Sequence, residues 1–163
     1  MATSDLTPRR YTEGLPPGTS PDVAAFLREQ GVPTQVITIF KATDALHALE
    51  ADDGKPRPGI VIGYSREEEQ IYVDPASGQV FLLASWAGDV PLIVNRDLPS
   101  FTASLAYIAE RYPFTLPVKD IESAGHLSDE LRAHLVEIDP TCVNEPDGFW
   151  APFLEDVAVG DYS

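Results

Sequence analysis

The sequence predicts an α+β fold: a central, mainly antiparallel sheet arranged as a β-meander, with helices packed around it. Apolar, β-branched stretches gather between residues 59 and 94, separated by short turn-forming segments. Amphipathic helical patterns precede and follow this region instead of alternating with the strands, as they would in a parallel sheet. The length of 163 residues suits one domain. We expect a flexible N-terminal segment over residues 1–14 and a single domain over residues 15–163.

Before the meander, the sequence predicts two helices and a strand. Ser20 as N-cap and Pro21 in the first turn begin a helix over residues 22–30, which Gly31 ends. The β-branched run 35–40 predicts a strand. Thr43 is expected to cap a weaker helix over residues 44–50, and a loop over residues 55–58 follows.

The meander itself is expected to contain strands at residues 59–64, 70–73, 79–84 and 91–94. Between the second and third of these strands, Asp74 precedes a proline and Gly78 closes the segment. This order is typical of a type I turn with aspartate at its first position. Asp74 is therefore interpreted as a turn-forming residue and not as a catalyst.

Three helical segments are predicted after the meander. Asn95 or Asp97 caps a helix over residues 99–111, in which apolar residues recur at helical spacing. Ser128 is expected to cap an amphipathic helix over residues 129–137. The aromatic tail, residues 149–157, is expected to pack as a last helical segment.

The charge balance restricts the classes of partner. The chain has 26 acidic and 11 basic residues, a formal net charge of −15, and a field of this sign repels phosphate backbones and anionic lipid. Eleven of the acids lie from Asp120 onward, where Arg132 is the single base. Two interpretations stay open: the acidity serves solubility, or it attracts a basic partner. We expect no direct binding to nucleic acid or membranes.

The cysteine and histidine content bears on the cellular compartment and on possible metal sites. Cys142 is the single cysteine, which excludes an internal disulfide framework and favours a reducing compartment. No apolar run approaches the ~20 residues of a membrane span. His126 and His134 can share a helix face only if the helix begins before His126. We therefore expect a cytoplasmic, soluble protein without a metal site or another cofactor.

No catalytic constellation stands out. The chain lacks the spacing of a phosphate-binding loop, of a dinucleotide fold and of a nucleophile elbow. Paired carboxylates are abundant, so a small carboxylate-dependent hydrolase stays open as a less favoured hypothesis. A non-enzymatic binding protein is the preferred one, and we assign no catalytic residues.

Five residues of the meander loops are candidates for binding a partner: Glu67, Glu68, Glu69, Trp86 and Asp89. The glutamates fall where two strands connect, and they form either a solvated loop or an acidic loop that meets a basic partner. Trp86 follows a strand and is either core packing or a binding hot spot, because tryptophan is enriched at both.

A series of different short motifs occurs in a defined order along nearly the whole chain. They are Leu15-Pro-Pro, Ala25-Phe-Leu, Gly31-Val-Pro33, Ile62-Gly63, Ile71-Tyr-Val-Asp74, Ser77-Gly-Gln-Val80, Val94-Asn95, Leu98, Phe101, Leu105, Asp139-Pro140, Phe149-Trp150 and Gly160. This order resembles the SUKH superfamily, specifically its fourth immunity-protein family. That family tends to have Asn-Ser-Ser-Leu before the long helix, where this chain has Asn95-Arg96-Asp97-Leu98. Asp97 preserves the capping function.

The resemblance implies a SUKH-like α+β fold and a role in bacterial polymorphic toxin systems. A protein of this kind binds a cognate toxin domain, often a nuclease or a nucleic-acid deaminase, and blocks it by occupancy without catalysis. Such a toxin is expected to have a basic substrate groove, to which an acidic partner would be attracted. The alternative is a regulatory or scaffold protein on the same fold.

Overall fold

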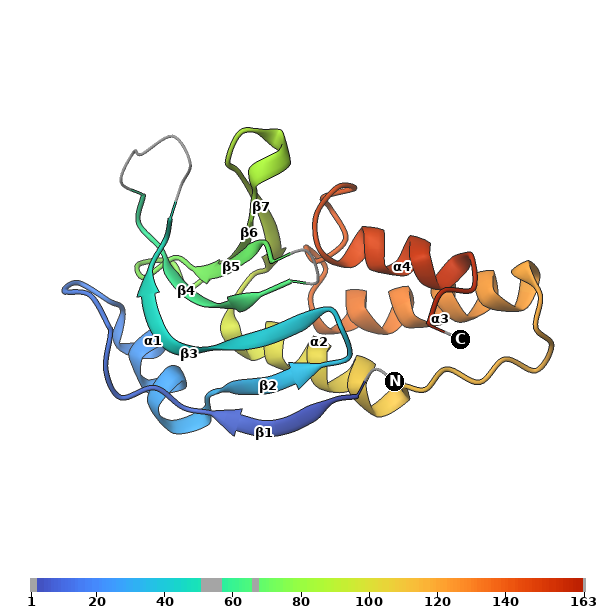
Figure 1. Ribbon diagram of the computed structural model, residues 1–163, viewed down its shortest axis with the longest axis horizontal. Coiled ribbons are helices and arrows are strands. Elements are labelled where there is room, and N and C mark those ends of the chain that lie inside the picture. The colour runs from blue at the N-terminus through green and yellow to red at the C-terminus, as the bar shows by residue number, and fades with distance from the viewer. Residues whose placement is uncertain (1–2, 51–56, 66–67, 163) are drawn as a thin grey trace.

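The computed structural model describes residues 3–50, 57–65 and 68–162 (Figure 1). These residues form a seven-stranded antiparallel sheet and helices, so the predicted α+β class is confirmed. The strands are β1 (Asp5–Arg9), β2 (Val32–Val36), β3 (Phe40–Ala48), β4 (Ile60–Tyr64), β5 (Gln70–Val73), β6 (Val80–Ala84) and β7 (Val90–Asn95). The helical elements are α1 (Pro21–Ala25) with its π-helical continuation η1 (Phe26–Gln30), the 3-10 turn η2 (Ser85–Ala87), α2 (Leu98–Arg111), α3 (Ile121–Ile138) and α4 (Trp150–Ala158).

The sheet is a meander in which each strand pairs with the next one along the chain, in the order β1 to β7. Its middle strands have apolar side chains on both faces, because alternate residues point to opposite sides of a strand. Ile62, Ile71 and Leu82 join the main core, whereas Val61, Tyr72 and Leu83 form a smaller cluster on the other face. The near-continuous apolar runs of β4 to β6 follow from this two-sided burial.

The helices form one layer behind the sheet and extend past it. In Figure 1, α1 and α2 lie behind the strands, and α3 and α4 lie side by side beyond them. A row of aromatic rings joins these layers, from Phe40 in β3 through Phe101 in α2 to Phe149, with ring centroids 5.2 and 6.2 Å apart. The C-terminal helical pair is thus anchored to the sheet through the core.

Several predicted elements are confirmed. The first predicted helix corresponds to α1 and η1, and Gly31 after it has a φ of 77°. β5 has the predicted bounds, and the Asp74 carboxylate accepts the Ala76 N–H at 2.9 Å in the predicted turn. Asp97 caps α2 by accepting the Ser100 N–H at 2.8 Å. Residues 55 and 56 of the predicted loop over residues 55–58 lie outside the described residues.

The expected helix over residues 44–50 is wrong, because residues 44–48 belong to β3. His47 and Ala48 pair with Val61 and Ile60 of β4. Without that pairing, the backbone groups of the buried strand β4 would lose their partners on one side. The helix propensities involved differ by less than about 1 kcal/mol per residue, so the tertiary requirement prevails.

The expected single strand over residues 35–40 is interrupted by a turn. Ile37 has a φ of 47°, which is rare for a β-branched residue, and the Ile39 N–H bonds to the Val36 carbonyl at 3.1 Å. Both isoleucines are buried. Burial of each side chain, worth roughly 1.5–3 kcal/mol, offsets a backbone strain of about 1–3 kcal/mol. No glycine, proline or asparagine marks this turn in the sequence.

Two further boundaries differ from the expectation. Residues 1–14 were expected to be flexible, but Asp5–Arg9 forms edge strand β1 and pairs with β2. The helix expected from residue 129 begins at Ile121, because Asp120 caps it by accepting the Ser123 N–H at 2.7 Å. Ser128 is not a cap: its hydroxyl donates to the Leu154 carbonyl at 2.7 Å and ties α3 to α4.

Candidate functional site

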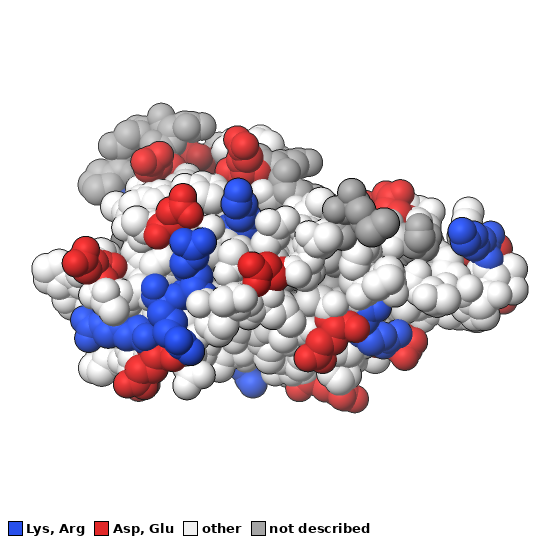
Figure 2. All heavy atoms as spheres, turned by 60° about the horizontal axis from the view of Figure 1, so that its bottom comes forward, with Lys and Arg blue, Asp and Glu red and all other residues white. Residues whose placement is uncertain are grey.

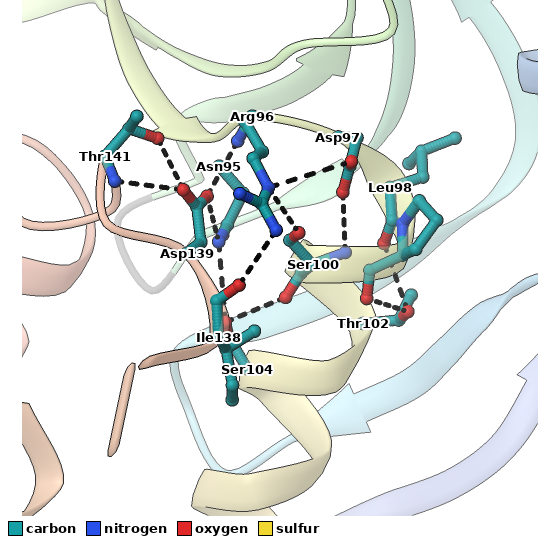
Figure 3. A network of polar contacts seen from close by, with 11 residues as sticks. Asn95, Arg96, Asp97, Leu98, Ser100, Thr102, Ser104, Ile138, Asp139 and Thr141 are labelled. Carbon is teal, nitrogen blue, oxygen red and sulfur yellow. Dashed lines mark hydrogen bonds and ion pairs between the residues drawn. The ribbon is translucent and has the colours of Figure 1, made fainter. Parts of the chain in front are cut away.

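Figure 3 shows four residues of a buried polar cluster, Asn95, Ser104, Asp139 and Thr141. The cluster joins β7, α2, α3 and α4, and it is the first place where chemistry could be located. It consists of Asn95, Ser104, Asp139, Thr141 and Trp150. The Asn95 amide donates to Asp139 Oδ2 at 3.0 Å, and its Oδ1 accepts the Trp150 indole N–H at 2.9 Å. The other Asp139 oxygen, Oδ1, accepts the N–H and hydroxyl of Thr141 at 3.0 and 2.7 Å.

The geometry of this cluster is that of a structural element. Asn95, Asp139 and Trp150 are all 0% exposed, and no buried side-chain nitrogen or oxygen of the described residues lacks a partner. Burial raises the pKa of Asp139, but hydrogen bonds from the Arg96 N–H, Thr141 and Asn95 outweigh it, so this pKa lies below its ordinary value. A closed, fully bonded carboxylate cannot meet a substrate or a partner.

An open pocket lies at the other end of β6, and we call it the Trp86 pocket. It has a volume of about 160 Å³. Ile39, Leu82, Phe149 and Phe153, all buried, form its apolar floor, and Ser65, Glu69, Trp86 and Asp147 lie among its polar and exposed lining residues. The pocket thus combines residues of the sheet with residues of the loop before α4 and of α4 itself.

Trp86 is held in an exposed position by the backbone around it. It lies in η2, and its side chain is 55% exposed. Gly88 and Asp89, which follow it, have φ angles of 79° and 61°, so the chain turns sharply into β7. The Arg57 side chain donates to the Asp89 carbonyl. These features present a large aromatic side chain on an ordered turn.

Glu69 connects two loops of the sheet beside this tryptophan. Its carboxylate accepts the Ser85 hydroxyl at 2.6 Å and the Ser85 N–H at 3.3 Å. The Glu69 carbonyl also accepts the Ser65 N–H at 2.9 Å. The loop before β5 and the loop after β6 are therefore joined at the mouth of the pocket.

The structure describes four of the five predicted partner-binding residues, and they lie in different surroundings. Glu69 and Trp86 line the same pocket. Glu68 is exposed, and its N–H bonds to the carbonyl of Ser65, another residue of the pocket. Asp89 is 4% exposed and has a φ of 61°, so it belongs to the turn and offers little surface to a partner. Glu67 lies outside the described residues.

Sequence reasoning missed Asp147 and Phe149 as neighbours of Trp86. Gly148, between them, is required: a Cβ there would lie 2.9 Å from Glu145 Cβ and 3.2 Å from the Glu145 carbonyl oxygen. The dipeptide Asp147-Gly148 does signal a turn. Nothing in the sequence indicates which strand that turn faces, about 60 residues earlier along the chain.

The negative charge is distributed unevenly. Figure 2 shows a face on which Lys and Arg side chains gather. Arg10 follows β1 and donates from Nε to the Glu29 carbonyl at 2.9 Å, next to Arg28 on η1. Residues 120–163, in contrast, hold eleven acids and one base.

Other kinds of site find little support in the part of the chain that the structure describes. It contains no group of three or more His, Cys, Asp or Glu side chains able to hold a metal ion. α3 carries both His126 and His134, contrary to the expected helix start. Burial raises the pKa of the Cys142 thiol to about 11, which opposes thiolate formation. Among the described helices, none has the length and apolar character needed to cross a membrane.

The comparisons with known proteins agree with the fold and the motif order. Searches of curated proteins and of solved structures gave no match. A family model described as SUKH-4 immunity protein matches residues 13–156, which is most of the chain. The protein therefore belongs to the SUKH-4 immunity protein family.

Proposed function

We propose that this protein neutralises a cognate bacterial toxin domain in the cytoplasm by binding it, without catalysis. Membership of an immunity-protein family supports a toxin as the partner. The binding face that we propose is the end of the sheet that carries Glu68, Glu69 and Trp86, with Asp147 from the loop before α4. The assignment of Glu67 to this face stays a prediction, because this residue lies outside the described residues. Asp89 is assigned to the turn that presents Trp86.

The observation that carries this choice of face is the exposure of Trp86. Trp86 is 55% exposed beside a pocket that is partly lined by apolar side chains, so its ring is available to pack against a partner. Tryptophan is among the residues most enriched at binding hot spots, which lie in pockets surrounded by polar rims. The tie between Glu69 and Ser85 reduces the conformational entropy that the face would lose on binding.

Charge supports a basic partner of the kind that acts on nucleic acids, a nuclease or a nucleic-acid deaminase. A net charge of −15 would steer a toxin with a basic substrate groove and would compete with phosphate for it. The patch of Lys and Arg side chains seen in Figure 2 would repel the same partner. Long-range electrostatics would therefore disfavour approach through that patch.

The geometry of the residues that the structure describes does not favour the hydrolase hypothesis. A general acid needs a raised pKa inside a pocket. Hydrogen bonds lower the pKa of Asp5, Asp120 and Asp139, and none of the three lines the Trp86 pocket. We therefore propose inhibition by occupancy.

The experiment that tests this function is capture of the partner. The tagged protein is used to isolate partners from its native bacterium at low and high salt, and mass spectrometry identifies them. We expect a stoichiometric, basic toxin domain whose retention decreases with salt. Recovery of only a cellular protein unrelated to toxins would contradict the proposal and favour a regulatory scaffold.

With the toxin domain in hand, the substitution Trp86→Ala tests the face. We expect binding to weaken by about 2 kcal/mol or more, roughly 30-fold in Kd, by isothermal calorimetry. Ile121→Ala is the matched control, because Ile121 is an exposed apolar residue (74%) on α3. Unchanged affinity of Trp86→Ala for the toxin would place the interface elsewhere.

A further inference from the structure

The Trp86 pocket has a composition that selects its occupant. Its lining includes buried apolar residues and Trp86, together with two acidic residues, Glu69 and Asp147, from two separate loops. At about 160 Å³ it is smaller than the ~300–1,000 Å³ of typical small-molecule sites. It is therefore suited to the end of one long side chain.

The acidic lining residues determine which charge the bound side chain can carry. Two carboxylates on a protein of net charge −15 would repel an anionic group. A purely apolar side chain would leave these carboxylates dehydrated without a partner, which is unfavourable. A cationic side chain with an apolar stem can pack the stem against the apolar lining residues and pair its charge with the acidic ones.

We propose that the Trp86 pocket receives an arginine side chain of the partner. Arginine is favoured over lysine because its planar guanidinium stacks on aromatic rings and donates to carboxylates in a fork. Each Glu69 carboxylate oxygen accepts one bond from Ser85 and retains a second lone pair for such a donor. This inference rests on the proposed function for the identity of the partner, but not for the chemistry of the pocket.

The pocket can be tested without the toxin, with ethylguanidinium as the probe and the neutral ethylurea as its matched control. The readout is the indole N–H signals in a ¹H–¹⁵N NMR spectrum of the whole protein. The chain has two tryptophans, and the buried Trp150, bonded to Asn95, serves as an internal reference. Trp86→Phe assigns the remaining signal.

We expect ethylguanidinium to shift the Trp86 signal in a saturable way, with ethylurea shifting it at least threefold less at the same concentration. The double variant Glu69→Gln with Asp147→Asn should weaken the response to ethylguanidinium at least threefold. Glu122→Gln, an exposed acid on α3 that does not line the pocket, should leave the response unchanged. Glu69→Gln keeps an acceptor for Ser85, so the loops are expected to stay joined.

Three outcomes would overturn the inference: no saturable shift at Trp86, equal responses to the two probes, or an unchanged response in the double variant. Each concerns the pocket alone, because no toxin is present. A cation-selective pocket together with a capture experiment that yields no toxin would instead overturn the proposed function.

Discussion

The two tryptophans of this protein lie in regions that differ in almost every physical respect. Trp150 is 0% exposed and donates its indole N–H to Asn95 in the buried polar cluster, whereas Trp86 is 55% exposed at the mouth of a pocket. The cluster is closed and fully bonded. The Trp86 pocket is open, and its carboxylates retain capacity for a further donor.

The motifs that carry the family resemblance include the tryptophan of one of these two regions and not that of the other. Asn95, Asp139 and Trp150 all belong to those motifs, and they meet in the buried polar cluster. Glu69, Trp86 and Asp147 belong to none of them. The resemblance therefore identifies the residues that build the fold, and it carries no information about which toxin is bound. In the proposed binding mode, partner choice can vary at the Trp86 pocket while the cluster maintains the architecture.

The largest effect is expected from the same substitution made in both regions. Trp150→Ala should lower the free energy of unfolding by about 3–5 kcal/mol, because it leaves a cavity and removes the partner of Asn95 Oδ1. Trp86→Ala should change it by no more than about 0.5 kcal/mol. Urea denaturation measures both. Equal losses in the two variants would show that Trp86 also supports the fold.

The response to acid tests how much the Asp139 carboxylate contributes to the stability of the buried polar cluster. The pKa of Asp139 lies below its ordinary value of 3.8 in the folded protein, so the ionised carboxylate adds stability above that pH. The contribution disappears as the pH falls through the folded pKa. Asp139→Asn should cost about 1–3 kcal/mol at pH 7 and flatten the loss of stability below about pH 4. Parallel pH profiles for the wild type and this variant, from thermal unfolding, would contradict this role.

The smallest effect is expected at the tie beside the Trp86 pocket. Ser85→Ala removes the hydroxyl that donates to Glu69, and because Ser85 is exposed, the loss of stability should stay below about 1 kcal/mol. Toxin affinity should fall severalfold, since the two loops would no longer be held together before binding. Ser77→Ala, at another exposed turn of the sheet, is the control. Affinity loss in both variants would indicate a general effect on the sheet.

The reach of sequence reasoning can be seen in single elements. Helix α2 was predicted because Asp97 caps it and its apolar residues recur at helical spacing, both of which are local signals. The turn at Ile37 was not predicted, because residues with strong β propensity form it and their burial, which depends on the whole core, stabilises it. Strand β3 was mistaken for a helix in part because its pairing partner, β4, begins twelve residues after β3 ends.

In the candidate site, too, some features could be predicted from the sequence and others could not. Its acidic and aromatic character could be predicted, because Glu69 and Trp86 lie in loops of a meander that the alternation of apolar residues makes visible. The exposure of Trp86, the burial of Asp89 and the position of Asp147 beside both loops could not be predicted from the sequence. Strands, caps and net charge depend on residues close together in the chain. Pockets and buried clusters depend on contacts between distant segments, and these are decided only when the whole core packs.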